Sequence, residues 1–407
     1  MPSDPPAPLD AVVAGGGLSG LCLAARLAVG GWADRRVLVV DDGGATAARS
    51  WGFWAPASAA PDPAVARSFR RLRIHAAGRT RLLDLEPYRY QVVRRAHLHR
   101  VVSELISGCP GFTMATGRVG EIRDGGDEAV VDVGGQRIRS RWVFDSVTRP
   151  AESAPDAWLA FTGWQVRCDR PVFDPEVPVL FDFRTEQGDG SRFVYVLPDD
   201  PYRALVEVTA FVPRHAATPS PSERDVALAT YLREVLAVDN YDVVRREAAV
   251  LALVTHPHRR AGRRVLRIGA AGGLIKASTG YAYTRIQRDS AAIVASLIGH
   301  GHPFAAPRQR RRHRLLDRVL LTVLDREPAL LQDSFARLFD GAPAARVLRF
   351  LDEDTGVGEE LRLISTLRAG PFGAAAWAAL RAARRRRRSV AGGRDGAPGT
   401  SACPDRT

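Results

Sequence analysis

Lysine, methionine and cysteine are scarce in this chain of 407 residues. Lys276 is the only lysine, so the formal net charge of +13 comes almost entirely from arginine. The four cysteines are widely spaced, without a Cys-x-x-Cys pair or a cluster of histidines. This spacing indicates neither a zinc site nor a disulfide framework, and we predict no metal site. It fits a reducing, cytoplasmic setting.

Long apolar segments are also absent from the sequence. No apolar run approaches the ~20 residues that a helix needs to span a bilayer. Residues 1–10 are rich in proline and lack the apolar core of a signal peptide. We therefore expect neither a membrane-spanning helix nor a signal peptide.

Arginines gather at the C-terminal end of the chain. Eight arginines but only two acidic residues follow Leu380, and Arg384–Arg388 form one run. Because no recognition motif accompanies them, we expect no nucleic-acid partner. We predict that residues 381–407 form a disordered, arginine-rich tail, which is either solvated or weakly bound to anionic lipid.

A glycine-rich turn follows the first predicted strand. Residues 9–14 are expected to form this buried strand, and residues 15–20 read Gly-Gly-Gly-Leu-Ser-Gly before a helix. A second strand at 37–40 ends in Asp41, about 20 residues after the last glycine, where its carboxylate can accept from ribose hydroxyls. This order of elements predicts a dinucleotide-binding unit.

Each glycine of the turn has its own reason to be there. Gly15 permits the tight turn, Gly17 lets the backbone approach the pyrophosphate, and Gly20 allows close packing of helix and strand. The amides of Leu18 and Ser19 lie at the expected helix N-terminus, where they would face the phosphates.

The rest of the chain predicts a second sheet and then a helical region. Residues 115–145 alternate like a hairpin that returns to the first sheet. Asp, Pro and Gly turns separate the next candidate strands, which lie at 161–168, 179–184, 192–197 and 203–212. Such a run of strands after a strand–helix–strand unit indicates an inserted sheet domain. The pattern from Asp289 onward is helical.

We therefore predict an α/β fold: a Rossmann-like dinucleotide-binding domain with an inserted antiparallel β-sheet substrate domain and a helical C-terminal region. Domains usually have roughly 100–200 residues, so the length of this chain agrees with two or three domains. The expected boundaries are 1–160 and 260–300 for the nucleotide domain, 161–259 for the sheet domain, 301–380 for the helical region and 381–407 for the tail. Within the helical region, the apolar face of 314–324 is a candidate membrane contact, with core packing as the alternative.

A second glycine-rich segment, residues 268–283, looks like the second flavin-contacting segment of dinucleotide-binding enzymes. Flavoprotein hydroxylases usually carry an Asp just after the first glycine, where it holds the flavin ribityl chain. Ala270 or Ala271 has that position here. The missing Asp predicts chemistry other than oxygen activation.

Several segments together resemble the bacterial, FAD-dependent lycopene beta-cyclases, and the likeness runs from about Asp10 to Leu380. One departure is Lys276-Ala277, where many members of that family read His-Pro. Besides the segment that ends at Tyr281, the matching pieces are Ser50–Trp54, Tyr90–Arg95, Phe161–Val166, Phe181–Arg184, Arg192–Pro198 and Ala204–Thr209.

The resemblance implies a carotenoid-synthesising isomerase that binds FAD and needs it reduced, with NADPH as the electron source. Such enzymes close the linear psi ends of lycopene into beta-ionone rings without net redox change. A terminal double bond is protonated, the neighbouring double bond attacks the tertiary cation, and a ring proton is lost. Because a carotene dissolves only in lipid, peripheral contact with the cytoplasmic membrane is expected.

Two acids match acids of the family. In the expected strand 204–211, Glu207 shares its face with Leu205 and Phe211, and apolar surroundings raise the pKa of a carboxyl so that it can act as a general acid. Asp182 is the second candidate catalytic acid, although Arg184 on the same face can simply pair with it.

The other candidate site residues fall into two groups. Aromatic faces stabilise a carbocation without attacking it, by up to ~2 kcal/mol when desolvated. The expected substrate contacts are Trp51, Phe53, Trp54, Trp164, Phe183, Tyr195, Phe211 and Tyr283. Beyond the glycine turn and Asp41, the expected FAD contacts are Arg95, Gly269, Gly280 and Tyr281.

Two other kinds of protein compete with the cyclase. A flavin-dependent monooxygenase or an isoprenoid reductase would have the same fold, but the missing Asp and the strand that carries Glu207 argue against them. A non-catalytic carotenoid-binding flavoprotein is the third interpretation, and the intact glycines argue against it.

Overall fold

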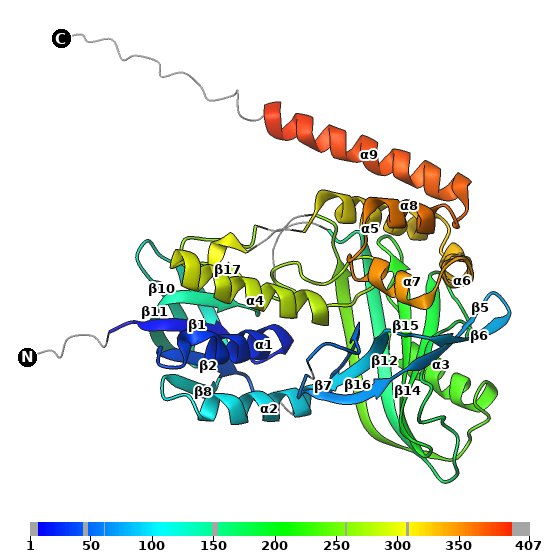
Figure 1. The fold of residues 1–407 in the computed structure, drawn as a ribbon, viewed down its shortest axis with the longest axis horizontal. Coiled ribbons are helices and arrows are strands. Elements are labelled where there is room, and N and C mark those ends of the chain that lie inside the picture. The colour runs from blue at the N-terminus through cyan, green and yellow to red at the C-terminus, as the bar shows by residue number, and fades with distance from the viewer. Residues whose placement is uncertain are drawn as a thin grey trace, which may run out of the picture.

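A computed structural model describes residues 7–43, 48–60, 62–148, 154–256, 259–306 and 309–392 (Figure 1). Side chains are described as far as Arg381. The strands form three sheets, and a set of helices follows them at the C-terminal end. The predicted α/β class is confirmed.

The first sheet has seven strands in the order β8-β2-β1-β11-β10-β9, and β17 pairs with β11. Strands β8, β2, β1, β11 and β17 run parallel, whereas β9 and β10 form an antiparallel extension. Strands β1 and β2 are almost wholly apolar because both of their faces are covered. The strands are β1 Leu9–Ala14, β2 Val37–Asp41, β8 Phe112–Thr116, β9 Val119–Asp124, β10 Ala129–Val133, β11 Gln136–Asp145 and β17 Val265–Arg267.

Three helices cover one face of this sheet, and their apolar residues share a core with β1 and β2. They are α1 Leu18–Leu27, which continues as a short π-helix over Ala28–Trp32, α2 Arg95–Ser107 and α4 Tyr283–His300. Helix α1 begins directly after Gly17, as the glycine turn predicts.

The second sheet also has seven strands, in the order β16-β12-β15-β14-β13-β5-β6. Helix α3, Pro221–Glu234, packs on one face, and the C-terminal helices pack on the other. The strands are β5 Arg71–Ala76, β6 Arg79–Asp84, β12 Ala157–Cys168, β13 Val179–Asp182, β14 Ser191–Asp200, β15 Arg203–Pro213 and β16 Tyr241–Leu253.

The composition of this sheet differs from the predicted domain boundaries. Strands β5 and β6 come from the range assigned to the nucleotide domain, yet β5 pairs in parallel with β13. The sequence pattern also did not predict β16, whose exposed residues alternate with buried or half-buried ones. A small third sheet of β3 Ser50–Pro56, β7 Tyr88–Arg94 and β4 Val65–Phe69 connects the two larger ones.

The C-terminal helices lie against the second sheet, with α9 along the outside of the molecule (Figure 1). Helix α5 buries Leu321 and Leu324 in the core that it shares with that sheet, so part of the 314–324 segment packs inward. None of the helices in the described part of the chain is both long and apolar enough to cross a membrane. Their bounds are η3 Pro303–Ala305, α5 Arg311–Arg326, α6 Leu330–Gly341, α7 Ala344–Leu351, α8 Val357–Ile364 and α9 Ala369–Gly392.

Helix α9 enters the segment that was predicted to be a disordered tail. The helix continues to Gly392, because the alanine- and arginine-rich sequence after Ala374 has high helix propensity. Residues 393–407, the rest of the predicted tail, lie outside the described residues.

Candidate active site

A cavity of about 340 Å³ lies where the glycine turn meets the second sheet. One end is formed by Gly17, Leu18 and Ser19 at the start of α1. The opposite wall is the apolar face of β12, β15 and β16, and the loop 269–282 closes the side between them. Segments distant in sequence therefore surround one space.

The glycine turn leaves room for a ligand in this cavity. Gly15 has φ +108°, and a Cβ there would overlap the Ser146 hydroxyl. A Cβ at Gly20 would overlap the Gly15 carbonyl oxygen, so turn and helix pack too closely for a side chain. A Cβ at Gly17, in contrast, would meet nothing within 4 Å. The open space at Gly17, next to the helix N-terminus, fits a phosphate group.

Asp41 ends β2 beside this turn, and its carboxylate is buried. The Arg95 guanidinium donates to Asp41 at 3.1 Å, and the His99 ring lies 3.6 Å away. Burial raises the pKa of Asp41, and the Arg95 charge opposes that shift. Arg95, an expected FAD contact, begins α2 and pairs with the acid at this edge of the sheet.

The second glycine segment forms a tight loop against the start of α1. Gly269 and Gly280 have φ values of +59° and +76°, which favour glycine. A Cβ at Gly269 would overlap the Ser19 hydroxyl, so this loop and the glycine turn are in direct contact. The Gly280 amide donates to the Lys276 carbonyl at 2.7 Å and closes the turn. Gly269, Gly280 and Tyr281 line the cavity.

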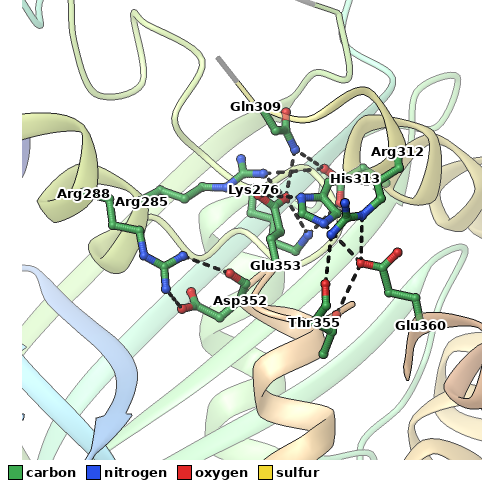
Figure 2. Close-up of polar contacts among 11 residues, drawn as sticks. Lys276, Arg285, Arg288, Gln309, Arg312, His313, Asp352, Glu353, Thr355 and Glu360 are labelled. Atoms are coloured by element: carbon green, nitrogen blue, oxygen red, sulfur yellow. Dashed lines mark hydrogen bonds and ion pairs between the residues drawn. The ribbon is translucent and has the colours of Figure 1, made fainter. Parts of the chain in front are cut away.

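Lys276 anchors this loop to the C-terminal helices (Figure 2). Its buried ammonium group donates to Asp317 of α5 at 2.9 Å and to Glu353 at 3.1 Å. Burial alone would raise the pKa of Glu353, but a hydrogen bond with His313 and the charges of Lys276 and Arg285 hold it far below its usual range. Lys276, which stands where many family members have the His of His-Pro, therefore has its own ion-pair partners in this chain.

Glu207 lies on β15 and lines the cavity, with its side chain half-buried. Strand alternation places Leu205 and Thr209 on the same face, as predicted. Burial, reinforced by the neighbouring carboxylate of Glu247, raises the pKa of Glu207 well above its usual range. The Thr209 hydroxyl donates to Glu207 at 3.1 Å. This environment therefore favours the neutral acid form of Glu207.

Three tyrosine hydroxyls share the cavity with Glu207. The hydroxyls of Tyr195 and Tyr281 are 3.3 Å apart, and Tyr90 is hydrogen-bonded to Tyr281. Burial raises the pKa values of all three well above the usual range of a tyrosine, so the hydroxyls stay protonated. Tyr90 was not among the predicted site residues, although it lies in one of the matching segments.

Glu247 is the second site residue that the sequence did not predict. It lies on β16, and the Ser50 hydroxyl donates to its carboxylate at 3.2 Å. It lies across Gly163 from Glu207 and does not line the cavity. The sequence gives little indication that Glu247 belongs to the site, because an acid in an alternating strand is usually solvated.

The predicted aromatic contacts separate into three groups. Trp51, Tyr195 and Tyr283 line the cavity. Phe53 stacks on Tyr283 at 4.3 Å and, with Trp54, lines a neighbouring cavity instead. The remaining three do not line the cavity: Phe183 and Phe211 pack in the core behind its wall, and Trp164 lies on the other face of the sheet, where it donates to Asp225.

Asp182 also lies away from the cavity. Its fully buried carboxylate accepts from Tyr231 of α3 at 2.7 Å and from Arg184 at 2.7 Å. Burial favours the neutral acid, but these two donors outweigh it and lower the pKa of Asp182. The structure therefore places Asp182 in an ion pair with Arg184, as the alternative interpretation anticipated, and does not bring it together with Glu207.

A family model described as "Lycopene cyclase protein" matches residues 10–376. A lycopene beta-cyclase from a Paracoccus species is 28% identical over 283 residues, which cover 63% of this chain and 70% of that relative. A lycopene beta-cyclase from Pantoea ananas is 26% identical over 247 residues, covering 57% of this chain and 62% of that relative.

Solved structures show the same fold at low sequence identity. A geranylgeranyl bacteriochlorophyll reductase-like protein from Thermoplasma acidophilum aligns with a TM-score of 0.61 and 13% identity, covering 89% of this chain and 97% of its own. A variant of HpxO from Klebsiella pneumoniae, complexed with FAD, aligns with a TM-score of 0.58 and 16% identity. The alignment covers 85% of this chain and 98% of that structure's chain. These likenesses confirm the predicted Rossmann-like flavoprotein fold.

Proposed function

Because the chain belongs to the lycopene cyclase family, we propose that it closes the psi end groups of lycopene into beta-ionone rings, as an isomerase of carotenoid biosynthesis. The observation that carries this proposal is the position of Glu207, whose carboxyl group, with its raised pKa, faces an apolar, tyrosine-lined cavity beside the glycine turn. Protonation of a double bond needs an acid of this kind, kept away from water.

The residues at the glycine turn fit FAD. The open space at Gly17 and the amides of Leu18 and Ser19 would hold the pyrophosphate, and Asp41 would accept from the ribose. The loop around Gly269 would lie along the flavin end. When bound and reduced by NADPH, the flavin would supply an electron-rich ring beside the positive charge of the substrate.

The side chains of this chain would carry the acid–base steps. Glu207 donates its proton to the terminal double bond, and a tertiary cation forms. The neighbouring double bond attacks that cation and closes the ring, after which a ring proton leaves. The aromatic rings of Trp51, Tyr195 and Tyr281 stabilise the cation. The same rings line the cavity and exclude water from it.

A second, apolar cavity of about 430 Å³ offers space for the rest of a long polyene. Leucines and phenylalanines of α5, α6 and α9 line it, including Leu320 and Phe335. Thr279 lines both this cavity and the first one. The few charged groups that line the second cavity, among them Lys276, are paired with one another. An apolar ligand there would therefore leave none of these groups unpaired.

Helix α9 supports a peripheral location on the cytoplasmic membrane. Its side chains Trp377 and Leu380 are exposed, and the Arg381 guanidinium lies over the Trp377 ring at 4.6 Å. The sequence of the same helix then continues into Arg384–Arg388. An amphipathic aromatic beside several cations is suited to the headgroup region of an anionic bilayer.

One incubation tests the proposed reaction. The purified protein is kept under anaerobic conditions with lycopene in liposomes, FAD and NADPH, and the pigments are separated by chromatography. We expect a ring-closed product of unchanged mass without net NADPH consumption. A product two mass units heavier would indicate a reductase, and a product that forms only with oxygen would indicate a monooxygenase.

A further inference from the structure

We propose that Glu247 is the proton-sharing partner of Glu207, and that the two carboxyl groups form a buried pair above Gly163 that holds one proton. This inference deepens the proposed function, on which it rests, by naming the residue that controls the acid. Glu247 does not line the cavity, so it acts through Glu207 as a positioning residue.

The strand register places the two glutamates on either side of one glycine. Gly163 of β12 is the direct partner of Glu207 in β15 and also of Glu247 in β16. Direct partners in neighbouring strands point to the same face of a sheet, and the outer two of three strands are about 10 Å apart. Two glutamate side chains can span that distance when they lean toward each other over the central strand.

Gly163 supplies the space in which they meet. Its φ does not lie in the left-handed region, so the backbone conformation itself does not require glycine. A Cβ there would lie 3.1 Å from Glu247 Cγ and 3.3 Å from Glu207 Cβ, closer than side chains normally pack. Leu205 Cδ1 would be nearer still, at 3.0 Å, so the missing side chain leaves room for Leu205 as well as for the two glutamates.

An unpaired buried oxygen of Glu247 indicates that the pair holds a proton. Glu247 Oε2 accepts from Ser50, whereas its buried Oε1 has no donor among the described residues when both acids are ionised. Glu207, on the other side of Gly163, is a neighbour that can donate to this oxygen when its carboxyl group is protonated. Two ionised carboxylates are acceptors only, so such a contact requires one of them to be protonated.

The pKa of Glu207 is raised further than that of Glu247, which favours Glu207 as the carrier of the proton. Burial raises the pKa values of both acids, but the hydrogen bonds from Glu207 and Ser50 favour the ionised form of Glu247. The cationic side chains that face the pair are Arg49, which acts on both acids, and Arg245, which acts on Glu247. The neighbouring tyrosines are neutral. We therefore assign the proton of the pair to Glu207 and its negative charge to Glu247.

This arrangement fits a reaction that takes up and releases one proton. When Glu207 gives its proton to the inner carbon of the terminal double bond, the dimethyl-bearing carbon becomes the tertiary cation, and the pair becomes doubly negative. The proton that the ring later loses restores the pair to one proton. Atoms and charges balance without an oxidant or a reductant.

The test is the pH profile of a Glu247→Gln variant. Glu207 acts in its protonated form, so turnover falls as the pH rises through its pKa. Replacing the negative neighbour with a neutral amide lowers that pKa, because a like charge no longer opposes ionisation. We expect the fall in turnover to move to lower pH by about one unit or more. Gly163→Ala, which separates the carboxyl groups, should shift the profile in the same direction.

A matched control lies on the same strand. Asp242 of β16 is exposed and pairs with Arg167 at 2.7 Å, so Asp242→Asn should leave the profile unchanged. A Glu247→Gln enzyme with lower turnover but the wild-type profile would overturn the proposal and reduce Glu247 to a structural role.

A substrate-free measurement separates this proposal from the proposed function. Infrared difference spectra of the FAD-loaded protein, recorded across a pH titration, should show the carbonyl stretch of one buried, protonated carboxyl. That band should vanish in Glu207→Gln and titrate at lower pH in Glu247→Gln. An identical band in wild type and Glu247→Gln would contradict the pair even if lycopene is cyclised. The expected spectra without any ring-closed product would contradict only the proposed function.

Discussion

Glu207 is the residue on whose carboxyl group the proposed chemistry depends. We predict that Glu207→Gln lowers cyclisation by at least ~100-fold, because the amide keeps the shape of the side chain but cannot donate a proton. Chromatography of the pigments measures the loss, and flavin absorbance shows that FAD is still bound. Turnover at the wild-type level would remove Glu207 from the mechanism. Asp182→Asn offers a comparison, since its ion pair lies away from the cavity and should influence stability more than proton transfer.

Two glycines of the turn should respond differently to the same substitution. Gly17→Ala adds a methyl group to open space at an ordinary φ of −80°, so the fold should be unaffected while FAD affinity falls at least tenfold. Gly20→Ala instead forces a methyl group onto the Gly15 carbonyl and should cost about 1–3 kcal/mol of unfolding free energy. Flavin titration and urea unfolding of both variants measure these effects. Equal FAD affinity in Gly17→Ala and wild type would place the pyrophosphate elsewhere.

At the scale of elements, the Lys276 ion cluster joins the loop 268–283 to the C-terminal helices. We predict that Lys276→Met costs about 1.5–3 kcal/mol, because the buried carboxylates of Asp317 and Glu353 lose the hydrogen bonds from its ammonium group, although Arg285 still pairs with both. Urea unfolding gives the value. Arg100→Gln, at an exposed pair with Glu104, is the matched control and should cost about 1 kcal/mol or less.

The same cluster gives the stability a pH dependence with a definite sign. The pKa of Glu353 is depressed in the folded state, so its contribution is present above the pKa of an unfolded glutamate and is lost as the pH falls toward the folded value. Wild type should therefore lose more stability than Lys276→Met between neutral and acidic pH. An equal acid sensitivity in both proteins would contradict this role of the cluster.

The elements that the sequence predicted well are those with local patterns. The strand, glycine turn and helix around Gly17 are specified within thirty residues, and alternation alone placed Glu207 on the cavity face of β15. The pairing of β5 with β13 and of β16 with β12 joins segments far apart in the chain, and no local pattern encodes it. Glu247 therefore stayed hidden, since only that pairing sets it opposite Gly163.

At the scale of the whole molecule, α9 is the proposed contact with the bilayer. We predict that the protein sediments with vesicles containing anionic lipid and that Trp377→Ala together with Leu380→Ser weakens this binding at least fivefold. Binding should also decrease with added salt, since the arginine charges are screened. Neutral phosphatidylcholine vesicles are the control, and equal binding to both vesicle types would contradict the electrostatic part of the contact.

Lys276 has a further consequence for chemical labelling of the protein. It is the only lysine of the chain, and its amine is buried between Asp317 and Glu353. An amine-directed reagent thus finds only one lysine side chain in this sequence. Modification of Lys276, counted in the intact mass, would report the fraction of molecules whose loop has separated from the C-terminal helices. The protein therefore carries a built-in probe for local opening next to its proposed flavin site.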